Sequence, residues 1–292
     1  MPSNRDSEAL YRLSRRSLGL AGVLGVLLIA VVVNHWLHDG EETINPFNPI
    51  AAAASQTQSA AGYTAKMNVI YSVPDQGQPV RADGELEYNA TTGRARANLS
   101  VPTPAGTFAV ESVASSHHVY VRSDAFGDML PAGAEWIGIE PLIGQTSPGF
   151  AGSEGAQDQL QMLRAVGDVE TVGTEAVNGV ETHRYRGTIY FDRVIDLFER
   201  EGEKALADKY RQLDDLMPDT IPVEVWIAPD GTVREVLTVT TLPSQDGRPE
   251  VTMDMRITMD QVGVSPEIDL PDPGSVYNAT PALRQQLQGL SA

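Results

Sequence analysis

The segment VNGVETHRYRGTIYF places a histidine, a tyrosine and two arginines side by side. His183 is one of five histidines in the chain, and Arg184, Tyr185 and Arg186 follow it directly. A histidine next to a tyrosine could serve as a general base or bind a metal ion. Successive side chains of a strand point to opposite faces, however, so His183 and Tyr185 would share one face and the arginines the other. The spacing favours ordinary strand residues over a catalytic cluster.

The other candidates for chemistry are weaker. His117 and His118 are adjacent in an expected strand and would point to opposite faces, and the sequence has no H-x-x-x-H or H-E-x-x-H spacing. It also lacks a G-x-S-x-G elbow, a phosphate-binding glycine loop and a dinucleotide fingerprint. The acidic pair Asp214 and Asp215 is typical of a solvated helix face. We therefore expect no enzymatic activity, no metal site and no cofactor.

Composition argues against nucleic-acid binding and against any feature that needs cysteine. The formal net charge is −18, which disfavours binding to the phosphate backbone of nucleic acids. The chain contains no cysteine, so disulfides, thiolate metal sites and a cysteine-linked lipid anchor are excluded.

The N-terminal region predicts a membrane anchor. Residues 18–37, from Leu18 to Leu37, are uncharged and mostly apolar, and their length suits one bilayer crossing. Four arginines precede this run and HDGEE follows it, so we expect residues 1–17 in the cytoplasm and the rest of the chain outside the cell membrane. The alternative is a signal peptide, because SRRSLGL resembles a twin-arginine signal and AAAAS offers small residues. Those alanines lie about 17 residues beyond the apolar run, which favours an uncleaved helix.

After a linker at 38–47, alternating apolar and polar residues predict a sheet. The pattern continues through residues 48–262, with turn sequences such as PDQGQ, NATTG and the hairpin signal Asn178-Gly179 between the strands. The predicted fold is α+β: a large curved antiparallel sheet of about eleven strands, with a few helices across its concave face. The expected strands are 63–71, 80–88, 95–101, 107–113, 117–122, 135–140, 169–177, 180–190, 223–228, 232–242 and 250–260.

Three other segments complete the expected organisation. A short helix follows Asn48, and two helices with a break near Gly202 lie between residues 192 and 217. The glycine- and proline-rich loop at 141–155 is long enough to be a functional flap. Residues 263–292 form a tail rich in proline and aspartate, with a possible short helix at 281–287.

The inward positions of the sheet suggest space for a ligand. They are small on the early strands and flexible methionines on the last strand, a combination that suits an apolar cavity. The alternative is that helices fill this space completely as ordinary core. The expected cavity-lining residues are Met67, Ala82, Gly84, Leu86, Ala97, Leu99, Phe108, His183, Tyr185, Met253, Met255 and Met259.

Three segments carry a family resemblance: INPFNPIAAAASQTQSAAGYTAKMNV, DVETVGTEAVNGVETHRYRGTIYF and PVEVWIAPDGTVREV. Over residues 48–260 the chain resembles the LppX/LprG-type actinobacterial envelope lipoproteins, which share a half-barrel fold with the LolA/LolB carriers. The resemblance implies that the domain holds or shuttles a lipid, lipoglycan or acyl chain. The chain departs from that family because it lacks the lipobox cysteine, so the 18–37 helix would be the tether. The alternative is a sensor or adaptor that binds a lipid signal or a protein partner and regulates a membrane protein.

Overall fold

The computed structural model describes residues 48–73, 78–103, 106–115, 118–139, 160–214, 217–242, 244 and 250–280. The expected membrane helix at 18–37, the linker, the 141–155 loop and the 281–287 helix lie outside these residues. Among the described helices, none combines the length and apolar character needed to cross a membrane.

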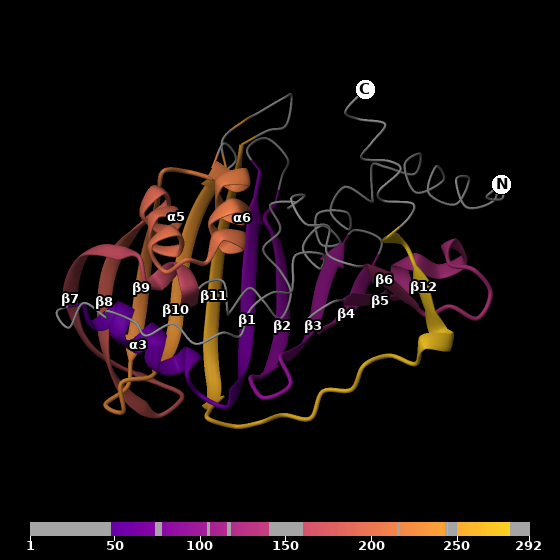
Figure 1. Cartoon of the computed structure of the whole chain (residues 1–292), viewed down its shortest axis with the longest axis horizontal. Helices are drawn as coiled ribbons and strands as arrows, with labels where there is room; N and C mark the ends of the chain where they lie inside the picture. The colour runs from indigo at the N-terminus through magenta and orange to yellow at the C-terminus, as the bar shows by residue number, and fades with distance from the viewer. Residues whose placement is uncertain are drawn as a thin grey trace.

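Twelve strands form one open sheet with the order β12-β6-β5-β4-β3-β2-β1-β11-β10-β9-β8-β7 (Figure 1). The strands are β1 (Gly62–Ser72), β2 (Val80–Asn89), β3 (Arg94–Thr103), β4 (Gly106–Ala114), β5 (Val119–Ser123), β6 (Trp136–Ile139), β7 (Val166–Val177), β8 (Val180–Tyr190), β9 (Thr220–Ile227), β10 (Val233–Leu242), β11 (Val251–Val262) and β12 (Val276–Asn278).

The sheet consists of two meanders joined at one seam. Strands β1 to β6 pair in sequence order, as do β7 to β11, and β1 pairs antiparallel with β11 to unite them. All eleven expected strands are present. The expectation of a purely antiparallel sheet was wrong, because β12 pairs parallel with β6 and makes the sheet mixed. This strand has only three residues, too few for an alternating pattern to reveal it.

The C-terminal segment that leads to β12 is anchored to β2 and β3 by side-chain hydrogen bonds. The side chain of Asn89 donates to the carbonyl of Pro266 at 2.9 Å, and that of Arg94 donates to the carbonyl of Ile268 at 2.9 Å. Ile268 is buried against Val113 and Trp136 in a small apolar cluster. Residues 264–278 are thus part of the folded domain.

The β7–β8 hairpin forms where the Asn-Gly signal predicts it. Asn178 has a φ of 49° and Gly179 a φ of 79°, so both central residues adopt the left-handed conformation that a type I′ turn requires. This turn sets the register of β8 against β7, in which His183 lies opposite Thr174. On its other side β8 pairs with β9, where His183 lies opposite Ile227 and Tyr185 opposite Val225.

The labelled α-helices gather over the β7–β11 half of the sheet (Figure 1). Helix α3 (Pro49–Gln58) begins at Asn48, whose side-chain oxygen accepts from the amides of Ile50 and Ala51, with Pro49 at the first position. Helices α5 (Phe191–Arg200) and α6 (Lys204–Asp214) pack against each other, separated by Gly202 with a φ of 78°. The face beneath them is called the inner face, and the opposite face of the sheet is called the outer face.

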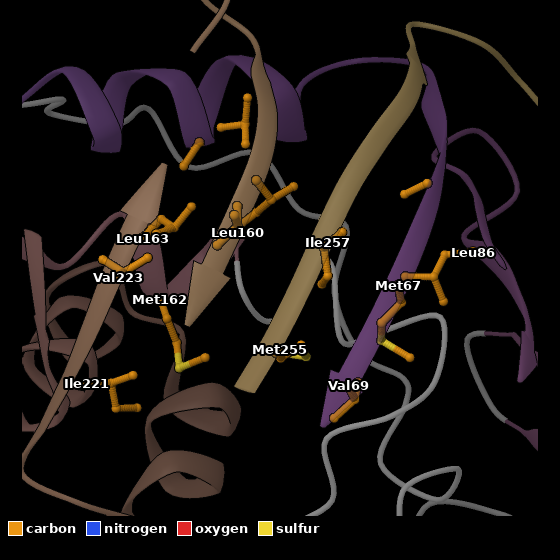
Figure 2. Close-up of a cluster of buried hydrophobic side chains, with 14 of the residues drawn as sticks. Met67, Val69, Leu86, Leu160, Met162, Leu163, Ile221, Val223, Met255 and Ile257 are labelled. Carbon is orange, nitrogen blue, oxygen red and sulfur yellow. The ribbon is translucent and has the colours of Figure 1, made fainter. Parts of the chain in front are cut away.

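One continuous apolar core lies on the inner face. It includes the inward residues of β1, β2 and β3 as well as those of β9, β10 and β11, together with side chains from α3, α5, α6 and the helical residues 160–163. Figure 2 shows part of this cluster, where Leu160, Met162 and Leu163 face the same side of the sheet as Val223, Met255 and Ile257.

Candidate functional site

The inner face brings most of the predicted lining residues together. Met67, Ala82, Leu86, Ala97, Leu99, Met253, Met255 and Met259 are buried there in the common core. Gly84, Phe108 and Tyr185 are half-buried, and Tyr185 packs against the core. His183 lies near the start of β8 and is exposed, so it stands apart from the others.

Gly84 does not provide empty space. A Cβ atom on this residue would lie 2.4 Å from the Cδ2 atom of Leu99 and 2.8 Å from the carbonyl oxygen of Asn98 on β3. The side chain of Leu99 therefore occupies the room that the glycine leaves, and Gly84 serves close packing between β2 and β3.

This contact leads to a prediction for Gly84→Ala. The added methyl group would have to displace a backbone carbonyl of the paired strand, so the free energy of unfolding should fall by about 1–2 kcal/mol. Urea denaturation would measure the loss. Glu85→Ala is the matched control on the same strand, because Glu85 is exposed and its replacement should change stability by less than about 0.5 kcal/mol. Equal stability of Gly84→Ala and wild type would contradict the contact.

A hollow of ≈ 600 Å³ opens where β5 ends beside β4 and the short helix η1 (Asp124–Met129). Its apolar wall consists of Leu99, Val110, Phe126 and Leu130, all of which belong to or pack against the inner-face core. Leu99 is the one predicted lining residue that borders it. The hollow therefore borders the described core.

The rim of this hollow is charged. Glu111, Arg122, Asp124 and Glu135 line it, together with the polar side chain of Asn98. Arg122 pairs with Glu111, lies 3.7 Å from Glu135 and stacks over the ring of Trp136 at 4.7 Å. The hollow thus combines an apolar interior with a polar mouth, the usual character of a site for an amphipathic molecule.

Sequence reasoning did not identify the apolar residues Phe126 and Leu130 or the rim residue Arg122. Phe126 lies in η1, which Ser123 caps by accepting from the amide of Ala125 at 3.2 Å. The available local signal for this short helix was Ser123 followed by Asp124, a pair typical of a helix start. Nothing in the alternating pattern of β5 indicated that the strand ends at a hollow.

The histidine-tyrosine-arginine segment has a structural role on the outer face. Glu224 on β9 accepts from Arg184 Nε at 3.0 Å and from Arg186 Nη2 at 2.9 Å. The ring of Trp226 lies between the guanidinium groups of Arg184, at 4.9 Å, and Arg256, at 5.5 Å. We call Arg184, Arg186, Glu224, Trp226 and Arg256 the outer-face cluster. Its charges are paired within the sheet, which supports packing of the strands.

The electrostatics of Glu224 follow from this cluster. Burial acts to raise the pKa of its carboxyl group, but the hydrogen bonds and positive charges of Arg184 and Arg186 more than offset this effect. The net result is a pKa below the ordinary value for glutamate. Across the part of the chain that the structure describes, no group of three histidine, aspartate or glutamate side chains is arranged to hold a metal ion.

The fold and the site define a class of protein with two features. One is an open mixed sheet with helices on one face, and the other is a hollow that borders the core, with an apolar wall and a charged rim. No family model matches the chain, and no curated protein matches it. Among solved structures it is similar to LprF from Mycobacterium bovis, at a TM-score of 0.40 and 15% identity over 77% of this chain and 95% of that one.

Two further structures show the same kind of likeness. The lipoprotein LppX from Mycobacterium tuberculosis matches at a TM-score of 0.38 and 14% identity, over 76% of this chain and 96% of that one. A LolA superfamily protein from Nitrosomonas europaea matches at a TM-score of 0.31 and 8% identity, over 77% and 94%. These are the groups that the sequence resemblance names, and at such identities the likeness concerns the fold alone.

Proposed function

We propose that this protein binds a lipid or acyl chain at the inner face and holds or shuttles it outside the cell membrane, tethered by residues 18–37. The observation that carries the proposal is the hollow at the end of β5. Its apolar wall of Leu99, Val110, Phe126 and Leu130 is continuous with the inner-face core, while its rim is charged. An amphipathic ligand fits this division, because it can enter at the polar mouth and then lie with its acyl chain against the inner-face core.

Other residues of the inner-face core support the same proposal. Met253, Met255 and Met259 belong to the same core, and their unbranched thioether side chains can repack around a chain that enters it. The expected lining residues on β1 to β3 extend this apolar surface away from the described helices. Binding would draw mainly on apolar contacts, without a metal or a catalytic group.

Native mass spectrometry of the full-length protein, with solvent extraction of the bound material, tests the proposal. Wild-type protein purified from its membrane should carry acyl lipid. Ala134→Trp should strongly reduce the loaded fraction, because Ala134 lines the hollow and an indole ring there would fill it. Ala132→Trp is the matched control, since Ala132 is exposed two residues away and does not line the hollow.

Three outcomes would contradict the proposal. One is a wild-type protein that carries no lipid, and another is an Ala134→Trp variant that loads as well as Ala132→Trp. The third is an empty protein that instead co-purifies with a membrane protein partner, which would favour the sensor or adaptor function. Thermal unfolding of both variants ensures that a loss of loading is not a loss of folding.

A further inference from the structure

A hydroxyl group without a hydrogen-bond partner lies in the core of the inner face. Thr238 on β10 is 1% exposed, and its Oγ1 atom has no hydrogen-bond partner among the described residues. Thr238 lies directly opposite Met255 on β11 and Val223 on β9, both of which belong to the core. Since directly paired residues share a face, the hydroxyl group of Thr238 lies on the inner face.

The position of this hydroxyl group is unusual for packed core. A buried hydroxyl normally has a partner, because leaving one unpaired in an apolar environment is unfavourable. Valine has nearly the same shape and would fill the same position without that cost. Thr238 is therefore explained better by a partner that arrives from outside the protein than by packing.

The surroundings limit what that partner can be. The next inward residue on β10, Thr240, is 2% exposed and lies opposite Met253, which also pairs with Tyr71 of β1. Burial raises the pKa of the Tyr71 hydroxyl to about 12, in keeping with apolar surroundings. The residues paired around Thr238 carry no charge, so a carboxylate placed there would be buried without a counter-ion. A neutral hydrogen-bond acceptor meets no such penalty.

We propose that Thr238 donates a hydrogen bond to the ester carbonyl of an acyl lipid bound at the inner face. The inference rests on the proposed lipid-binding function and adds the ligand class: an acyl ester in preference to a plain hydrocarbon. An ester carbonyl accepts from the Thr238 hydroxyl, and its acyl chain lies among the methionines of β11. A hydrocarbon leaves the hydroxyl unpaired.

The test compares two probes with 16-carbon chains, methyl palmitate and hexadecane, in equilibrium binding to the full-length protein. Wild type should bind methyl palmitate more tightly than hexadecane. Thr238→Val should weaken methyl palmitate binding roughly tenfold and leave hexadecane binding unchanged. Thr238→Ser should restore ester binding because it restores the hydroxyl group. The thermal midpoint of unliganded Thr238→Val should equal or exceed that of wild type, since an unpaired buried hydroxyl has been removed.

The results separate the two proposals. If wild type binds neither probe, the lipid-binding function itself fails and the ester preference fails with it. If wild type binds both probes and Thr238→Val weakens both equally or neither, lipid binding stands and the ester contact is overturned. A Thr238→Val protein that is less stable than wild type without ligand would show that the hydroxyl group has a partner in the protein or in bound water, and would also overturn it.

Discussion

Replacing Trp226 by alanine is expected to lower the free energy of unfolding by about 3–5 kcal/mol, the usual cost of deleting a large buried aromatic side chain. Trp226 is 2% exposed, although it lies on the outer face of the sheet. Its ring is covered by the guanidinium groups of Arg184 and Arg256, and its indole N–H donates to Glu175 at 3.0 Å. Alanine would remove the ring that links β9 to side chains of β7, β8 and β11.

Equilibrium urea denaturation measures this loss. Trp226→Phe is the control, because it keeps an aromatic ring between the arginines and loses the indole N–H. It should lose about 1 kcal/mol for the hydrogen bond to Glu175, together with part of the packing. A loss below about 1 kcal/mol for the alanine variant would show that the ring contributes little to holding the strands together.

Replacing Glu224 by glutamine should destabilise the protein by about 1.5–3 kcal/mol at pH 7, the range for hydrogen bonds to charged groups. The Glu224 side chain is 17% exposed and accepts from both Arg184 and Arg186, so its neutral replacement weakens two charge-assisted pairs. Glu181→Gln on β8 is the control, because Glu181 is exposed. Its replacement should change stability by less than about 0.5 kcal/mol.

The effect of Glu224 should depend on pH in a defined direction. The folded-state pKa of Glu224 is lower than its unfolded value of about 4.3, so the charged carboxylate stabilises the protein above that value. The stabilisation is lost as the pH falls through the folded-state pKa. The difference in unfolding free energy between wild type and Glu224→Gln should therefore have its full value at pH 7 and disappear at acidic pH. A difference that does not change with pH would contradict the charge-based origin.

Local pattern predicted much of this fold because its strands are long and one of their faces is apolar. The alternation on β8 correctly separated Arg184 and Arg186 from Tyr185, and the Asn178-Gly179 turn correctly placed the hairpin. The inward methionines of β11 lie in the core as their spacing indicated. Each of these features depends on neighbours within a few residues, and such features are visible in a sequence.

Other features depend on contacts between distant segments. Strand β12 exists because Val276 lies beside Trp136 on β6, and no local pattern encodes that pairing. Gly84 was expected to leave space, but Leu99 of the neighbouring strand fills it. The hollow at the end of β5 arises where β3, β4, β5 and η1 meet. Polar residues such as Thr238 were not singled out either, because their meaning depends on which side chains surround them.

The seam between β1 and β11 has a consequence for the order in which the protein folds. During synthesis β1 leaves the ribosome with the first meander, whereas its partner β11 follows only after the other strands of the second meander, β7 to β10, have been made. Until then β1 has one free edge, and a charged residue such as Lys66 on that strand discourages pairing with other chains. Joining the meanders is thus a late, long-range and slow step, so a nascent chain is most exposed to misassembly just before its last long strand emerges.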